Sequence, residues 1–109
     1  MAYDEKLAER LNNLVKNRKG FDQKKMFGGI AFMLNGNMCF GIHKDSLVIR
    51  TSQESANNSL KRKYVKLFDI TGRPMKGWIM VSKEGIKTKE SLDKWTSLAV
   101  DFVKTLPKK

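Results

Sequence analysis

Hydrophobic residues recur at helical spacing near both ends of the chain, and each run begins with a residue that can cap a helix. Asp4 takes the capping position of the first run and Thr88 that of the second. The apolar faces of the two runs consist of Leu7, Leu11, Leu14 and Val15, and of Leu92, Trp95, Thr96, Ala99, Phe102, Val103 and Leu106. The spacing predicts amphipathic helices over residues 4–17 and 88–106.

Between these helices, apolar runs separated by turn residues predict three antiparallel strands. The runs cover residues 27–34, 38–42 and 47–51. Asn35-Gly36 separates the first two runs, and it favours a tight hairpin because both residues tolerate a positive φ. Lys44-Asp45 supplies the second turn.

Pairing about these two turns assigns each strand residue to one face of the sheet. The predicted partners are Met33 and Met38, Ala31 and Phe40, Gly29 and Ile42, Ile42 and Leu47, and Phe40 and Ile49, and we expect all of them to face the helices. The opposite face would carry Gly28, Ile30, Phe32, Leu34, Cys39, Gly41, His43, Ser46, Val48 and Arg50. A half-apolar face is either covered by later chain or used for contact with another molecule. We take Ile30, Phe32 and Leu34, with Arg50 at the polar end, as a candidate interface that a homodimer would bury.

The middle of the chain predicts a second helix and further strands. Residues 52–63 favour a helix, residues 65–70 are either a short strand or an extended connection, and residues 78–82 alternate as a strand does. The helix would turn three side chains inward, those of Ala56, Leu60 and Tyr64. The order α-β-β-β-α-β(-β)-α predicts a single α+β domain over residues 1–109, with helices on an antiparallel sheet in two layers.

Charge is the unusual global property of the chain. Twenty-two basic residues stand against 11 acidic ones, which gives a net charge of +11. Such an excess favours nucleic acid, acidic proteins or anionic surfaces as partners, although a solvated, lysine-rich surface would show the same number. Five residues are candidate contacts to phosphate or carboxylate groups: Lys61, Arg62, Lys63, Arg73 and Lys76. The alternative for the first three is a solvated helix end, and for the last two a strand-entry loop with incidental charges.

The residues with catalytic or metal-binding potential form no recognisable site. Gly28-Gly29 precedes a strand rather than a helix, so it does not match a phosphate-binding loop; it would instead let a helix or an aromatic ring lie close to the sheet. Cys39 and His43 lie four residues apart on one strand, with about 13 Å between their Cα atoms, too far to share a metal ion or a proton. The carboxylates are scattered. We therefore expect no enzymatic activity, no cofactor and no metal.

Sequence features that would place the protein in or across a membrane are missing. The longest apolar runs fall well short of a membrane span, and the charged N-terminus lacks the apolar stretch of a signal peptide. Cys39 is the single cysteine and has no partner for an internal disulfide. We expect a cytoplasmic protein with no membrane contact.

Two short motifs concentrate backbone-shaping residues, Met26-Phe27-Gly28-Gly29 and Arg73-Pro74-Met75-Lys76-Gly77-Trp78. In the second, Pro74 would stiffen the approach to the strand, Gly77 would free the backbone and Trp78 would anchor the strand in apolar surroundings. With the hairpin and the last helix, these motifs resemble the TfoX N-terminal domain family. The resemblance is carried by residues 25–33, 36–41, 47–50 and 73–78 and by Trp95, Ala99 and Phe102.

The resemblance spans nearly the whole chain and implies an α+β domain similar to the secretion-chaperone-like folds, which often dimerise. Members named for competence regulation carry a second, C-terminal domain and act in transcriptional control of DNA uptake. We expect this chain to be a stand-alone member without that domain. The family implies no catalytic residues.

Taken with the charge, these features predict a small non-enzymatic regulatory or interaction module, linked to transcription or competence, that acts through protein contact as a homodimer. The alternative is weak, salt-dependent nucleic-acid binding through dispersed Lys and Arg. A third hypothesis, a small-molecule-binding or enzymatic domain, requires a pocket with convergent polar groups.

Overall fold

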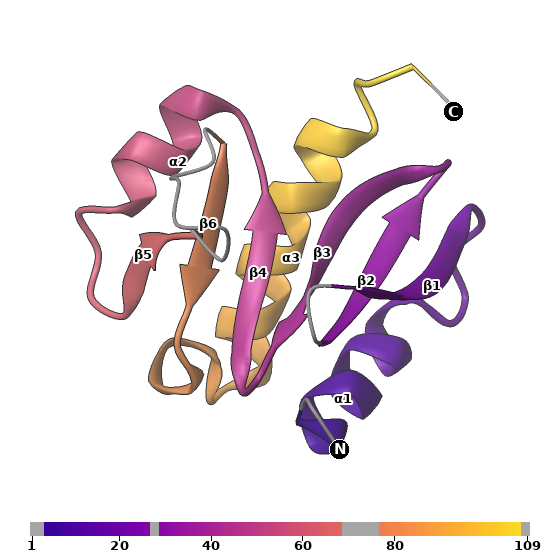
Figure 1. The fold of residues 1–109 in the computed structure, drawn as a ribbon, viewed down its shortest axis with the longest axis horizontal. Helices are drawn as coiled ribbons and strands as arrows, with labels where there is room; N and C mark the ends of the chain where they lie inside the picture. Colours follow the sequence, from indigo (N-terminus) through magenta and orange to yellow (C-terminus); the bar gives the residue numbers. More distant parts are fainter. Residues whose placement is uncertain (1–3, 27–28, 69–76, 108–109) are drawn as a thin grey trace.

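Six strands form one antiparallel sheet in the computed structural model, which describes residues 4–26, 29–68 and 77–107. Their spatial order is β1-β2-β3-β4-β6-β5. The bounds are Phe21–Met26 for β1, Gly29–Leu34 for β2, Asn37–His43 for β3, Ser46–Arg50 for β4, Val65–Leu67 for β5 and Trp78–Val81 for β6. Because β6 lies between β4 and β5, the chain skips one strand position on its way from β4 to β5, and it does so through a helix (Figure 1).

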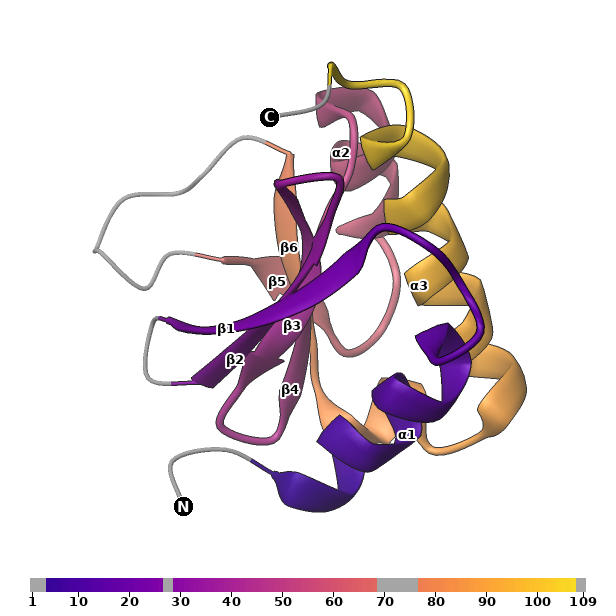
Figure 2. The same ribbon diagram turned by 90° about the vertical axis from the view of Figure 1, so that its right-hand side faces the viewer.

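Three α-helices lie on the same side of this sheet, which gives a two-layer molecule (Figure 2). They are α1 (Glu5–Val15), α2 (Gln53–Ser59) and α3 (Lys89–Val103), and a short 3-10 helix, η1 (Lys83–Ile86), precedes α3. Each α-helix starts at a polar cap. Asp4 accepts from the backbone N–H groups of Lys6 and Leu7, Ser52 from that of Ser55, and Thr88 from that of Ser91. The helices predicted at both ends of the chain and their caps are confirmed.

The main core lies between the helices and the sheet. Leu7, Leu11 and Val15 of α1 are buried there, as the helical spacing predicts. Ala8 of α1 is buried there as well. The other buried members come from β2, β3, β4, β6, α2, η1 and α3: Ile30, Phe32, Leu34, Cys39, Phe40, Ile42, Leu47, Ile49, Ala56, Ile79, Val81, Ile86, Leu92, Trp95, Ala99 and Val103. This continuous core supports the predicted α+β class.

A β-bulge in β3 changes the faces predicted for β2. Met33 pairs with Met38 as predicted, but Phe32 pairs with Phe40, which leaves Cys39 as an extra residue in β3. The predicted partners Ala31–Phe40 and Gly29–Ile42 are therefore wrong by one residue; Ala31 pairs with Gly41 and Ile30 with Ile42. The pairs of Phe40 with Ile49 and of Ile42 with Leu47, beyond the bulge, are confirmed.

Two other elements differ from their predictions. Strand β1 was not predicted, because its sequence FDQKKM carries charged residues in place of an apolar alternation. Helix α2 ends at Ser59. The chain then turns through Tyr64, which has a φ of +69° and a side chain that is 52% exposed, so its predicted inward orientation is wrong.

Candidate functional site

A second apolar cluster lies on the side of the sheet that no described helix covers. We call this surface the helix-free face; its members are Ala31, Met33, Met38, Val48, Phe68, Trp78 and Met80. Ala31 and Val48 are fully buried within it, whereas Met33, Trp78 and Met80 are half-buried. Methionine side chains adapt to irregular partners, and Trp is a frequent anchor of protein contacts. The half-buried members are therefore the part of this face available for contact.

The bulge corrects the candidate interface. Ile30, Phe32 and Leu34 were predicted to lie on the face away from the helices, but they belong to the core beneath α1 and α3. Phe32 has no exposed surface and stacks on Phe40, with ring centroids 5.0 Å apart. Because these side chains are buried by the chain itself, they offer no surface to a partner.

Arg50, the fourth member of that candidate interface, does lie on the helix-free face. Its guanidinium carbon sits 5.6 Å from the centroid of the Trp78 ring, and the Phe68 and Trp78 centroids are 6.4 Å apart. His43 approaches Phe68 edge-on at 6.0 Å. His43 and Arg50 thus stand at the two ends of an aromatic row that crosses the sheet from β3 to β6.

The glycines of the two motifs hold strands close together. A Cβ on Gly29 would lie 1.8 Å from the backbone oxygen of Ile42, so the close neighbour is strand β3 rather than the helix or ring that the sequence predicted. Gly77 has a φ of +81° and accepts a hydrogen bond of 2.7 Å from the Thr51 N–H. A Cβ there would lie 2.6 Å from the Thr51 oxygen. Gly77 thereby sets the start of β6, and Trp78 follows it onto the helix-free face.

Several motif residues fall outside the described part of the chain. They are Phe27, Gly28, Arg73, Pro74, Met75 and Lys76. Met26 is the last residue of β1 and pairs with Gly29. The candidate contacts Arg73 and Lys76 therefore stay predictions.

The candidate contacts Lys61, Arg62 and Lys63 lie between α2 and β5, and all three are exposed. The guanidinium carbon of Arg62 is 5.5 Å from the centroid of the Trp95 ring on α3. Arg62 also lines a cleft of about 420 Å³ between α2 and α3, together with Lys94 and hydroxyl and amide side chains. The three residues follow Leu60, the C-cap of α2, so contact with phosphate or carboxylate groups and a solvated helix end both stay open as predictions.

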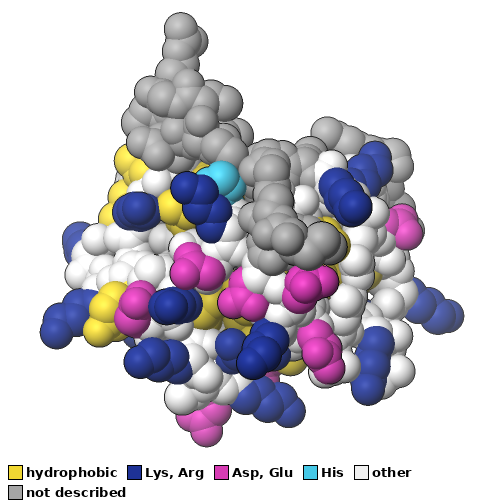
Figure 3. Space-filling model, turned by 60° about the horizontal axis from the view of Figure 1, so that its bottom comes forward, with side chains coloured by type: hydrophobic (Ala, Val, Ile, Leu, Met, Phe, Trp, Pro, Cys, Tyr) yellow, Lys and Arg dark blue, Asp and Glu magenta, His cyan; other side chains and the backbone are white. Residues whose placement is uncertain are grey.

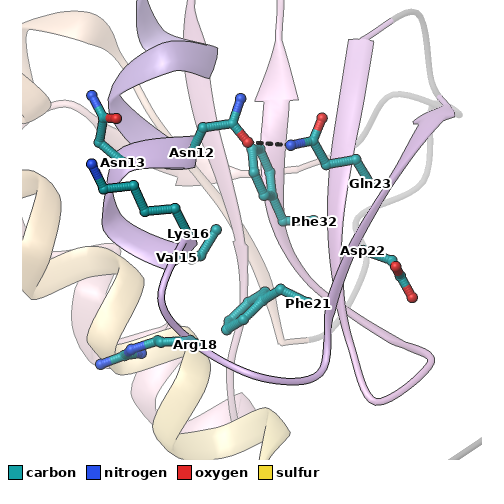
Figure 4. Close-up of a pocket in the computed structure, with 9 residues that line it drawn as sticks. All are labelled: Asn12, Asn13, Val15, Lys16, Arg18, Phe21, Asp22, Gln23 and Phe32. Carbon is teal, nitrogen blue, oxygen red and sulfur yellow. Dashed lines mark hydrogen bonds between the residues drawn. The ribbon is translucent and has the colours of Figure 1, made fainter.

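A cleft of about 390 Å³ separates α1 from β1 (Figure 4). Val15, Phe21 and Phe32 supply its apolar part. Its polar residues do not converge on one position: the Gln23 amide donates a hydrogen bond to the Asn12 side chain across the cleft. Arg18 extends toward α3 and Asp22 points away. The nine lining residues therefore lack the convergent polar groups typical of a small-molecule site.

Chemically reactive groups are few in the described residues. Burial raises the pKa of the Cys39 thiol to about 12, so the thiol stays protonated and unreactive near neutrality. No group of three His, Cys, Asp or Glu side chains within residues 4–26, 29–68 and 77–107 is placed to hold a metal ion. Over the same residues, no helix has the length and apolar character needed to cross a membrane.

Sequence reasoning missed the methionines of the helix-free face and the exposure of Tyr64. One signal could have placed the methionines on the correct face of the sheet. Along β2 the large residues Ile30, Phe32 and Leu34 alternate with the smaller Gly29 and Ala31, and the larger set is the better choice for the core.

The order of elements and the layering define this protein as a small two-layer α+β domain whose described helices all cover the same side of the sheet. The sequence model of the TfoX N-terminal domain matches residues 13–103, a range that includes both motifs. The chain therefore belongs to the TfoX N-terminal domain family, as its motifs predict. Comparison with curated proteins and with solved structures gave no match.

Proposed function

We propose that this domain is a non-enzymatic interaction module and that the helix-free face is its contact surface. One observation carries the proposal: an apolar cluster separate from the main core keeps Met33, Trp78 and Met80 half-exposed on the side without helices. Water-exposed apolar side chains of this kind gain free energy when a partner covers them.

The partner we propose is a second copy of the chain, and the two copies would contact each other through the same face. An isologous contact would stack two flat sheet faces, and the methionines can repack to fit one another. The resemblance to members named for competence regulation extends the proposal to a regulatory role in transcription or competence. The lone, buried cysteine agrees with a reducing, cytoplasmic setting.

Self-association of the Met80→Lys variant tests the dimer. Met80 lies on the helix-free face in β6, next to the edge strand β5, and it pairs with Val48 and Lys66. A lysine there would bring two like charges together across an isologous contact, so we expect a shift from dimer to monomer in sedimentation velocity. Asn57→Lys on the exposed side of α2 adds the same charge and should leave the dimer intact. A wild-type protein that stays monomeric across concentrations contradicts the dimer.

The second candidate function is weak nucleic-acid binding through dispersed basic residues. The net charge of +11 favours it, because the described residues contain a single ion pair, Lys104–Asp101 at 3.3 Å. Figure 3 shows Lys and Arg side chains spread over one side of the molecule and interleaved with Asp and Glu. Fluorescence anisotropy with a labelled oligonucleotide tests this function. Absence of binding at low salt would remove it.

A further inference from the structure

We propose that the surface around Tyr64 binds single-stranded nucleic acid, with the tyrosine ring stacking on a base and the surrounding lysines contacting phosphates. We call this surface the Tyr64 patch; it consists of Lys61, Lys63, Tyr64, Lys83, Gly85 and Lys87. The proposal rests on the second candidate function and gives it a location.

Tyr64 is unusual in both exposure and backbone conformation. Its side chain is 52% exposed, and it is the only large hydrophobic residue in the described chain that is exposed. Its φ of +69° lies in the left-handed region, which a bulky residue adopts only at a free-energy cost. Neither burial nor backbone preference explains a tyrosine here, since Asn or Gly would suit the turn better.

Tertiary contacts hold the ring against η1. The backbone N–H of Ser82 donates to the backbone carbonyl oxygen of Tyr64 at 2.8 Å, which fixes the backbone of Tyr64 beside the start of η1. A Cβ built on Gly85 would lie 3.2 Å from the Tyr64 Cβ and 3.7 Å from its Cδ2, so the ring rests against the glycine backbone. The absence of a side chain at Gly85 keeps the ring close to η1 and leaves its outer side open to solvent.

Basic residues flank Tyr64 and Gly85 in their two segments of the chain, and the two segments pack together at these residues. Lys61 and Lys63 precede Tyr64 in the chain, and Lys83 and Lys87 flank Gly85, and all four are exposed. Glu84 is the acidic residue of the same turn. Hydrogen bonds from its own backbone N–H and from Ser82 hold the pKa of its carboxyl below the usual value, and Lys83 and Lys87 lower that pKa further. Glu84 is therefore anionic near neutrality and offsets one of the four lysine charges, which leaves a net positive charge beside the tyrosine.

The basic surface continues from the patch toward α3. Arg62, between Lys61 and Lys63, lines the cleft between α2 and α3, and Lys94 lies on the same cleft. Hydroxyl groups of Ser55, Ser59 and Ser97 line it as well. Asp101 also lines the cleft, and its carboxylate is paired with Lys104 at 3.3 Å. Cations and neutral donors are the groups that contact a phosphate backbone, so a strand stacked on Tyr64 would extend along the Arg62 and Lys94 side of this cleft.

An exposed ring surrounded by lysines fits a single strand better than the other anionic polymers. Stacking needs an unpaired base, which a duplex does not offer. An acidic peptide would form ion pairs with the lysines, but it carries no bases that stack on the tyrosine ring. The aromatic row on the helix-free face is a poorer stacking platform, because Phe68 is only 3% exposed.

Anisotropy titrations of labelled (dT)12 test the aromatic part of the patch. Tyr64→Gly removes the ring and suits the left-handed backbone, so the variant should fold while its Kd rises about tenfold. Tyr64→Phe keeps the stacking surface and should bind like the wild type. A Tyr64→Gly variant that folds and binds (dT)12 with the Kd of the wild type overturns the proposal.

The charged part is tested by comparing two lysine pairs. Lys83→Gln with Lys87→Gln should reduce the slope of log K against log[salt] by about 1.4 for a single strand. Lys16→Gln with Lys19→Gln, in the connection from α1 to β1 at the opposite edge of the sheet from β5, removes the same charge and should change the slope less. Equal effects of the two pairs would overturn the patch while leaving dispersed binding in place.

Two competitors and the wild-type titration separate the remaining outcomes. A blunt 12-base-pair duplex and polyglutamate should compete poorly with (dT)12. Equal competition by either one shows that charge alone attracts the ligand, which overturns stacking on Tyr64. No binding of (dT)12 by the wild type at low salt overturns both the patch and the second candidate function.

Discussion

At the scale of single residues, Gly29 is the position where the chain tolerates least change. Its missing side chain lets the backbone of β3 approach, since a Cβ would lie 1.8 Å from the Ile42 oxygen and 2.9 Å from the Ile42 carbonyl carbon. Both atoms are backbone and belong to the centre of the sheet, so they cannot move aside as a side-chain end would. This explains why a glycine stands at the start of an otherwise apolar strand.

We expect Gly29→Ala to lower the free energy of unfolding by about 3 kcal/mol, because β2 and β3 must separate to admit the methyl group. Thermal unfolding followed by circular dichroism measures the change. Gly85→Ala is the matched control: its methyl would meet the Cγ1 of Val81 at 2.7 Å, a side-chain end that can shift. Gly85→Ala should therefore be the milder of the two. Equal melting temperatures for both variants would contradict the close approach.

At the scale of elements, α1 is attached to the rest of the fold by hydrogen bonds as well as by its apolar stripe. The backbone N–H of Asp4 donates to the Lys44 oxygen in the β3–β4 turn at 2.7 Å. Midway along the helix, the Arg10 guanidinium donates to the Ile86 oxygen at 2.7 Å. Arg10 thereby joins the first helix to the turn that precedes α3, across 76 residues of sequence.

Arg10→Met should lower the free energy of unfolding by about 2 kcal/mol, because the Ile86 oxygen loses a charged donor in a partly buried place. Methionine keeps the helix propensity and most of the side-chain volume. Urea unfolding provides the measurement, with Lys6→Met on the exposed side of α1 as the control for loss of one charge. If the two variants have the same unfolding midpoint, the Arg10 hydrogen bond contributes nothing to stability.

The elements that could be predicted from the sequence are those whose signal is local. A polar cap followed by an apolar stripe predicts α1 and α3, and Asn35-Gly36 predicts the β2–β3 hairpin. Strand β1 lacks such a signal, because its charged residues form a strand only by pairing with β2. The bulge at Cys39 is nearly as hidden: both faces of β2 are apolar, so the hydrophobic pattern does not reveal a shift of one residue, and only the difference in side-chain size between the two faces points to it.

The candidate site was predicted less well than the fold, because the site depends on strand register, which the hydrophobic pattern does not reveal. A one-residue error in register exchanges the two faces of a strand. Ile30, Phe32 and Leu34 therefore moved into the core, while Met33 and Met38 took the helix-free face. Arg50 lies on its predicted face because the β3–β4 pairs lie beyond the bulge and have the predicted register. The exposure of Tyr64 depends on contacts with η1, about 20 residues away, which a local pattern does not report.

At the scale of the whole molecule, the net charge of +11 makes the two proposed associations respond oppositely to salt. Two copies of a strongly basic chain repel one another, and salt screens that repulsion. Contact through the apolar helix-free face should therefore strengthen between about 50 and 500 mM NaCl. Nucleic-acid binding should weaken over the same range, because releasing counterions into a more concentrated salt solution gains less entropy.

Sedimentation velocity and fluorescence anisotropy on one preparation measure the two trends together. The Met80→Lys variant should lose the first association and keep the second, whereas Tyr64→Gly should do the reverse, since the two residues lie on different surfaces. Self-association that weakens with salt would mean that ion pairs hold the copies together, which contradicts contact through Met33, Trp78 and Met80. A single variant that abolishes both associations would show that they share one surface, and the division of this domain into a protein-binding face and a nucleic-acid-binding patch would then be wrong.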